Sequence, residues 1–382
     1  MALKATVSGH RTAILSQAWS RLIALIGEVV QRPLAAVLDP GRQVTGQARL
    51  EGAQLAAQVV QVAGRVHITD RTVGCGANPT VVATGEETVM STLSEPAGQK
   101  ARPAGERAGT ATQWPADRRI TIRDLQAATD RGERWSMLTS YDTLTAGVFE
   151  QAGVRALLVG DTSAELVLGY PDTVPVTMDE LVPMVQAVVR GTRTALVVAD
   201  LPFGSYQAGP AAAMANAVRH LKEGGAQAVK LEGGRRVLPQ VEIMVGAGIP
   251  VMGHLGLTPQ SINVLGGVRR IQGRGDAGDE LLADALVLEA AGAFAVVLES
   301  VPAALGRRVS DALRIPTVGI GAGPDCDAQI LVWQDMAGLT GGRLPRFVKS
   351  YADTRDRLLD AARRYVADVA DRRYPDQAHS YS

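Results

Sequence analysis

The sequence is poor in cysteine and in net charge, and each shortage excludes a class of protein. Its 382 residues include two cysteines, Cys75 and Cys326, which is too few for a disulfide-stapled secreted domain. The 39 basic and 39 acidic residues balance, so no overall field attracts nucleic acid or an anionic membrane. No apolar run reaches the roughly 18 residues that span a bilayer. We therefore expect a cytoplasmic protein that binds neither nucleic acid nor membrane.

Large aromatic side chains are scarcest in residues 1–118, which contain no Tyr or Phe and two tryptophans, Trp19 and Trp114. Such a segment buries too little area to offset its chain entropy. Residues 12–37 predict one amphipathic helix, whereas 41–117 show little periodicity. We expect 1–118 to be a low-complexity extension, largely disordered or partly helical, followed by one folded domain over 119–382. An artefactual extension of the reading frame and a targeting peptide are the alternatives.

From residue 120 onward, short apolar runs alternate with helical stretches of 10 to 15 residues. The runs are nearly continuous, as in strands that helices cover on both faces. This pattern predicts an α/β fold, a (β/α)8 TIM barrel. A doubly wound sheet is the alternative, but its Gly-rich first turn is missing. The predicted strands are 137–141, 156–160, 195–199, 228–231, 250–253, 295–298, 317–320 and 336–339. The predicted helices include 143–152, 178–190, 210–224, 281–291 and 302–313.

Two further helices flank the predicted barrel. Residues 122–131 form a short N-terminal helix before the first strand, which we expect to close the bottom of the barrel. Residues 351–372 form a long, charged C-terminal helix. It has an apolar side that we expect to pack outside the barrel or on another subunit. That side consists of Tyr351, Leu358, Leu359, Tyr365, Val366 and Val369.

Ionisable residues stand at the end of each of the first six predicted strands. In this fold the active site lies at this end of the strands, where the loops to the helices begin. Charges at the rim of an apolar barrel are costly unless they are paired or bind a metal, so chance does not readily explain the pattern. The residues are Asp142, Asp161, Asp200, Lys230 with Glu232, His254 and Glu299.

The three aspartates can also be interpreted as helix caps. Asp142 directly precedes the helix at 143–152, and an N-cap is the favoured role for it. Asp161 and Asp200 allow the same interpretation, but Pro202 delays the helix that follows Asp200. A metal-binding role is therefore favoured for Asp161 and Asp200.

The other strand-end residues have alternatives as well. Lys230 and Glu232 share the inner face of their strand, where a buried salt bridge without another role is possible. His254 alone is a weak signal. Glu299 is either a buried paired acid or a general base. The glycine-rich run at 319–323 suits either phosphate binding or a close backbone approach.

Two or three carboxylates without accompanying cysteines describe a site rich in hard oxygen ligands. Such ligands favour Mg²⁺ over Zn²⁺ or Cu²⁺. Because Mg²⁺ takes few protein carboxylates, positions remain for a small bidentate acid such as a 2-keto acid. The ion then acts as a Lewis acid that favours loss of a proton beside the ketone. Lys230 neutralises charge and Glu299 is a candidate base.

Several longer motifs are more specific than the fold. They occur in order over about two thirds of the chain, from about residue 120 to the end, and this part resembles the ketopantoate hydroxymethyltransferase (3-methyl-2-oxobutanoate hydroxymethyltransferase) family. The motifs are LTSYD at 138–142, LVGD at 158–161, ADLPF at 199–203, VKLEGG at 229–234, GHLGLTPQS at 253–261, QGRGD at 272–276, LE at 298–299, GIGAG at 319–323 and HS at 379–380.

The resemblance implies roles for several of the matching residues. The family's metal pair falls on Asp161 and Asp200, with Glu232 supporting the ion directly or through water. Glu299 corresponds to the proton acceptor. The family usually has Ser-Leu-Gly after the first metal aspartate, where this chain has Thr162-Ser163-Ala164; a threonine hydroxyl or backbone N–H serves equally there. The implied substrate-binding residues are Asp161, Thr162, Asp200, Lys230 and His254.

The resemblance also implies a reaction. Magnesium-assisted enolisation of 3-methyl-2-oxobutanoate precedes attack on the one-carbon unit of 5,10-methylenetetrahydrofolate, which gives ketopantoate, a step towards pantothenate and coenzyme A. A homo-oligomer, in this family a decamer, is implied too. The alternatives are a Mg²⁺-dependent lyase or mutase of the isocitrate lyase and phosphoenolpyruvate mutase type, and a barrel without enzymatic activity.

Overall fold

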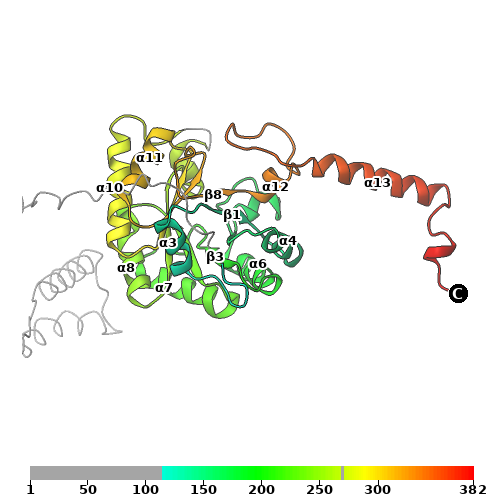
Figure 1. Cartoon of the computed structure of the whole chain (residues 1–382), viewed down its shortest axis with the longest axis horizontal. Coiled ribbons are helices and arrows are strands. Elements are labelled where there is room, and N and C mark those ends of the chain that lie inside the picture. The colour runs from blue at the N-terminus through cyan, green and yellow to red at the C-terminus, as the bar shows by residue number, and fades with distance from the viewer. Residues whose placement is uncertain (1–113, 268–270) are drawn as a thin grey trace, which may run out of the picture. The chain divides into compact units, whose positions relative to one another are not determined.

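The computed structural model describes residues 114–267 and 271–382, which form a closed barrel of eight parallel strands (Figure 1). The predicted fold class is confirmed. Strand order around the barrel follows chain order, and β8 pairs with β1 to close it. The strands are β1 (Trp135–Thr139), β2 (Ala156–Val159), β3 (Leu196–Asp200), β4 (Ala228–Glu232), β5 (Val251–Gly256), β6 (Ala295–Glu299), β7 (Thr317–Ile320) and β8 (Ala328–Leu331). The predicted helix at 12–37 lies outside the described residues.

Helices surround the strands on the outside of the barrel (Figure 1). The predicted helices are confirmed to within a few residues at most of their ends. A five-residue π-helical turn, His220–Gly224, continues α7 and places His220 in the interior. The α-helices are α3 (Ile122–Asp130), α4 (Thr143–Gln151), α5 (Ser163–Leu166), α6 (Met178–Gly191), α7 (Pro210–Arg219), α8 (Leu238–Gly246), α9 (Ile262–Leu265), α10 (Ala277–Ala290), α11 (Ala303–Ala312), α12 (Trp333–Met336) and α13 (Thr354–Ala370).

Alternate strand residues enter two different layers of the core. Leu158 and Val198 belong to the cluster inside the barrel, whereas their neighbours Leu157 and Val197 pack with residues of the surrounding helices. Because side chains alternate between the two faces of a strand, each interior residue fixes the direction of the residue two positions later. This register determines which polar side chains enter the barrel at the carboxyl ends of the strands.

Helix α3 closes the amino-terminal end of the barrel, as its sequence predicts. Leu125 and Ala128 are buried in the cluster that also contains interior strand residues such as Met137. A capping box between Thr121 and Asp124 fixes the start of this helix. The helix thus seals the end of the barrel opposite the polar residues.

Among the described residues, contacts with the barrel already occur upstream of residue 119, at Trp114. Its indole Nε1 donates a hydrogen bond to Glu133 at 2.8 Å, and the Arg155 guanidinium lies 4.9 Å from its ring centroid. The ring also packs against the interior cluster near α3. The last residues of the segment predicted as an extension therefore contribute to the folded domain.

The prediction for the last strand is wrong. We expected it at 336–339, but the strand is Ala328–Leu331, and Met336 ends the short helix α12. Ala328 and Ile330 point into the barrel, while Gln329 between them is exposed. This short alternating pattern is a weaker signal than the apolar run that follows it. Pairing of both edges, with β7 and β1, stabilises the strand where its sequence alone does not.

Helix α13 leaves the barrel, and its residues are all exposed or partly exposed (Figure 1). It begins three residues later than predicted, with Asp353 at the N-cap position. Hydrogen bonds from the amides of Thr354 and Arg355 to Ala337 and Gly338 attach its first turn. Within the two described stretches, no helix is long and apolar enough to cross a membrane.

Candidate active site

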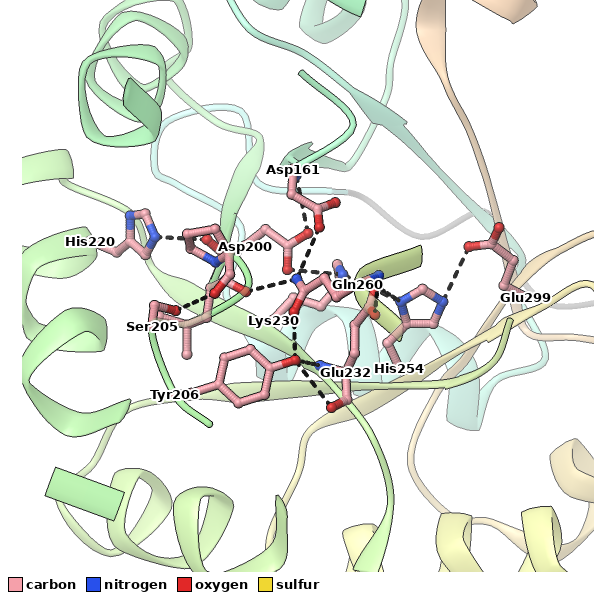
Figure 2. Close-up of polar contacts among 12 residues, drawn as sticks. Asp161, Asp200, Ser205, Tyr206, His220, Lys230, Glu232, His254, Gln260 and Glu299 are labelled. Atoms are coloured by element: carbon pink, nitrogen blue, oxygen red, sulfur yellow. Dashed lines mark hydrogen bonds and ion pairs between the residues drawn. The ribbon is translucent and has the colours of Figure 1, made fainter. Parts of the chain in front are cut away.

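The interior register brings five ionisable side chains together at the carboxyl ends of β3, β4, β5 and β6 (Figure 2). Each stands two positions after an interior residue of its strand, as with Glu299 after Val297. Four of them are almost fully buried, and the fifth, Glu299, has a side chain that is 17% exposed. The five residues are Asp200, Lys230, Glu232, His254 and Glu299.

Lys230 and Asp200 form a buried ion pair between neighbouring strands. The Lys230 Nζ lies 2.9 Å from Asp200 Oδ1. Burial lowers the pKa of Lys230, but Asp200, Glu232 and Asp161 outweigh it, so its pKa is raised and the ammonium stays charged. Burial raises the pKa of Asp200, which the Lys230 charge opposes and the Glu232 charge reinforces. The single charge of Lys230 thus stabilises several carboxylates at once.

Asp161 follows β2, which neighbours β3 in the barrel, and its side chain lies next to the Lys230–Asp200 pair. Its backbone N–H donates a hydrogen bond to Asp200 Oδ2 at 3.2 Å, and its Oδ2 accepts one from Gln260. Burial raises the pKa of Asp161 well above its usual range, and the charges of Asp200 and Glu232 add to this effect. Lys230 and Gln260 act in the opposite direction. The two aspartates are therefore neighbours that compete for positive charge.

Glu232, His254 and Glu299 form a row across the barrel end (Figure 2). His254 Nδ1 lies 3.3 Å from Glu232 Oε1, and His254 Nε2 lies 3.2 Å from Glu299 Oε2. Burial and the Lys230 charge lower the pKa of His254, but the contacts with Glu232 and Glu299 outweigh them and raise it to about 9. Burial raises the pKa of Glu232, yet His254 and Lys230 bring the net shift below the ordinary value. His254 is thus held between two carboxylates, which favour its protonated form.

The donor set fits a hard divalent cation. Among residues 114–267 and 271–382, no three His, Cys, Asp or Glu side chains already meet as a metal site. However, Asp200 Oδ1 and Glu232 Oε1 are buried, and a single cationic side chain holds each of them: Lys230 Nζ lies 2.9 Å from the first and His254 Nδ1 lies 3.3 Å from the second. Buried carboxylates that repel one another and share few positive charges are suitable ligands for Mg²⁺.

The remaining sequence candidates lie close to this group or have structural roles. Thr162 follows Asp161 and is partly buried. Asp142 caps α4, where its Oδ1 accepts hydrogen bonds from the amides of Leu144 and Thr145, as predicted. At Gly321 an added Cβ would lie 2.6 Å from the ring of Phe347, so this loop needs glycine for a close approach.

Sequence reasoning missed three side chains that contact the site. Gln260 in the loop after β5 donates to Asp161, and the Tyr206 hydroxyl lies 2.7 Å from Gln260 Oε1. The His220 ring Nε2 lies 2.8 Å from the carbonyl oxygen of Asp200. Gln260 and Tyr206 are neutral, and His220 lies within a helical stretch. The sequence offers no signal beyond the presence of Gln260 in the 253–261 motif.

Several known proteins are similar to this chain over most of its described residues. Residues 119–377 match the family model described as Ketopantoate hydroxymethyltransferase. A protein of Frankia casuarinae named 3-methyl-2-oxobutanoate hydroxymethyltransferase is 65% identical over 75% of this chain and 96% of its own. One of the same name from Thermobifida fusca is 60% identical over 70% of this chain and 95% of its own. Among solved structures, the phosphoenolpyruvate phosphomutase of Streptomyces platensis subsp. rosaceus is 17% identical with a TM-score of 0.45, covering 66% of this chain and 88% of its own.

Proposed function

Because the chain belongs to the ketopantoate hydroxymethyltransferase family, we propose that it transfers a hydroxymethyl group from 5,10-methylenetetrahydrofolate to 3-methyl-2-oxobutanoate, using Mg²⁺. The product is ketopantoate, a precursor of pantothenate and coenzyme A. The observation that carries the proposal is that the buried carboxylates of Asp161 and Asp200 share one barrel end with the more exposed carboxylate of Glu299. Such a site suits metal-assisted removal of a proton.

Asp161 and Asp200 are the residues that would hold the ion, with Glu232 as a third ligand, directly or through water. When bound, Mg²⁺ supplies a Lewis acid that polarises the keto acid and stabilises developing negative charge. The positive charge also offsets the repulsion among the three buried carboxylates. The protein contributes hard oxygen donors on the ends of rigid strands, which favours a fixed geometry.

Lys230, His254 and Thr162 are the proposed contacts to the keto acid, together with the two aspartates. Lys230 Nζ lies 3.4 Å from His254 Nδ1, so the two side chains form one polar wall. The carboxylates around them raise the pKa of both groups and so favour their protonated forms, and a substrate carboxylate or enolate oxygen near them is stabilised. The Thr162 hydroxyl or backbone N–H is placed to add a hydrogen bond next to Asp161.

Glu299 is the proposed general base. Its side chain is the most exposed of the five interior groups, so it can reach a bound substrate, while His254 orients it from one side. Glu299 accepts the C3 proton of 3-methyl-2-oxobutanoate. The resulting carbon nucleophile forms a bond to the methylene carbon of the folate. The bonds from that carbon to the folate nitrogens break, water supplies the hydroxyl group of the product, and tetrahydrofolate is released.

This proposal is tested by incubating the purified protein with 3-methyl-2-oxobutanoate, 5,10-methylenetetrahydrofolate and Mg²⁺. Ketopantoate is expected to appear in proportion to folate consumed. The runner-up, a lyase or mutase of the isocitrate lyase type, predicts carbon–carbon cleavage or rearrangement without folate. Family membership favours the transferase. Consumption of the keto acid at a rate that does not depend on folate would contradict the proposal.

We expect the enzyme to work in the cytoplasm as a homo-oligomer, a decamer by family resemblance, with a second copy covering α13. Along this exposed helix, Leu358 and Val366 lie on one side and are 55% and 65% exposed. Light scattering of the full chain should give a mass well above the 40.1 kDa of one subunit. Val366→Asp should lower that mass, because a charge disfavours burial of this side. Ala367→Asp, on the opposite side, is the control; equal effects of both, or a monomeric wild type, would contradict the interface.

Residues 1–111 are expected to be dispensable. The family match begins at residue 119, and the described contacts with the barrel begin at Trp114. A chain that begins at Thr112 should keep the activity and thermal stability of the full protein. One that begins at residue 119 should lose about 1–2 kcal/mol of stability, because it lacks the partly buried Trp114 ring. Insoluble or inactive protein from the Thr112 start would contradict this boundary.

A further inference from the structure

Gln260 connects the ends of three barrel strands through its backbone and its side chain (Figure 2). Its backbone N–H donates to Oε2 of Glu232, the last residue of β4, at 3.0 Å. Its side-chain Nε2 donates to Asp161 Oδ2 at 2.9 Å, after β2, and to the carbonyl oxygen of Leu201 at 3.0 Å, after β3. The residue itself is 4% exposed. One neutral side chain thus contacts two of the three carboxylates assigned to the metal.

The orientation of the Gln260 amide follows from its neighbours. Asp161 Oδ2 and the Leu201 carbonyl oxygen are both acceptors, so the group that faces them must be the NH₂ with its two protons. A flipped amide would set its oxygen against two other oxygens in a buried place. The amide oxygen therefore faces Tyr206, and the Tyr206 hydroxyl donates to it at 2.7 Å.

Tyr206 extends this arrangement back to β4. The Glu232 N–H donates to the Tyr206 hydroxyl at 3.2 Å, and that hydroxyl in turn donates its proton to Gln260 Oε1. The ring of Tyr206 is almost fully buried, so the hydroxyl is held in place by packing. A continuous chain of hydrogen bonds therefore runs from the backbone of Glu232 through Tyr206 and Gln260 to the carboxylate of Asp161.

We propose that Gln260 is a positioning residue, which fixes the Asp161 and Glu232 carboxylates for the divalent cation, and that Tyr206 fixes the Gln260 amide. This inference rests on the proposed function, since it needs a cation at Asp161. Asp161 has like charges as neighbours, and a carboxylate that is free to rotate would turn away from them. Gln260 prevents this by donating to one oxygen of Asp161 while it holds one oxygen of Glu232. Partners behind metal ligands typically affect metal affinity by about 10–100-fold.

The test is calorimetric titration with MnCl₂ alone, without substrate, for the full chain and its variants. Gln260→Met keeps the length of the side chain but removes its amide, while the backbone N–H that donates to Glu232 remains. Mn²⁺ affinity should fall by about 10–100-fold. Tyr206→Phe should give a smaller loss, since it removes only the proton that orients the amide. The double variant should match Gln260→Met, because both changes interrupt one chain of hydrogen bonds.

Gln240→Met is the matched control. Gln240 is another buried glutamine, and it donates to the Tyr206 carbonyl oxygen at 3.2 Å. If the role of Gln260 is merely structural, Gln240→Met and Gln260→Met should both lower the melting temperature, and both should keep the Mn²⁺ affinity of the wild type. We expect Gln240→Met to keep wild-type Mn²⁺ affinity whatever its melting temperature.

The outcomes separate this inference from the function on which it rests. If the wild type binds Mn²⁺ and Gln260→Met binds it equally well, the positioning role is wrong and the proposed function stands. If the wild type binds no divalent ion, the metal site and the positioning role both fail. Should Gln260→Met not fold, Tyr206→Phe decides alone: unchanged Mn²⁺ affinity in that variant overturns the proposal.

Discussion

Replacing Asp200 with asparagine is expected to abolish Mg²⁺-dependent formation of ketopantoate, with a loss larger than the roughly 10–100-fold typical of residues behind a metal ligand. The change removes a charged ligand and keeps the shape of the side chain. It also leaves Lys230 buried without its partner at 2.9 Å. Loss of one member of a buried pair costs about 3–5 kcal/mol of stability. Activity is therefore to be expressed per folded molecule, with the folded fraction measured by circular dichroism.

Asp142→Asn is the matched control for this experiment. Asp142 also follows a barrel strand, but its carboxylate caps α4. Asparagine caps helices about as well as aspartate, so stability and turnover should both stay near those of the wild type. Near-normal activity of Asp200→Asn at ordinary Mg²⁺ concentrations would contradict the metal assignment, as would an equal loss in Asp142→Asn.

Glu299→Gln is expected to lower turnover by about 10²–10⁴-fold while leaving Mn²⁺ binding intact. Glutamine fills the same volume beside His254 Nε2 but cannot take up a proton. Asp161, Asp200 and Lys230, which carry the proposed binding, are unchanged. The KM for the keto acid should therefore change little in comparison with kcat. The measurement is steady-state kinetics in both substrates at saturating Mg²⁺.

Glu280→Gln, in the exposed first turn of α10, controls for removal of a glutamate charge as such. It should turn over like the wild type. An increase in KM without a fall in kcat in Glu299→Gln would assign Glu299 to substrate binding instead of proton removal. A fall in kcat that is matched by lost Mn²⁺ affinity would place Glu299 among the metal ligands.

Much of the barrel could be predicted because most of its strands are continuous apolar runs that are recognisable in the sequence. Runs such as Leu196–Asp200 are buried throughout, and the alternation within them fixes which residue faces inward. That alternation places Lys230 and Glu232 on the same face, and the barrel fold makes this the inner face. The prediction of strand β8 failed because the exposed Gln329 interrupts its apolar run. Its position depends on pairing with β7 and β1, and β1 is distant in the sequence.

The sequence could predict only the charged residues of the candidate site. Asp161, Asp200 and Glu299 stand at strand ends, where a charged residue is unusual enough to be noticed. Gln260 and Tyr206 carry no charge, and they lie in loops whose course is set by tertiary packing. Their hydrogen bond spans 54 positions of sequence, a distance over which local patterns give no information.

Glu299 is the residue proposed to take the C3 proton of 3-methyl-2-oxobutanoate at this site. The most direct measurement is exchange of that proton with deuterium from solvent water, followed by NMR with Mg²⁺ and without folate. The wild type should exchange the proton, and Glu299→Gln should do so about 10²–10⁴-fold more slowly. Exchange by Glu299→Gln at the wild-type rate would contradict this role and would transfer the role of base to another group.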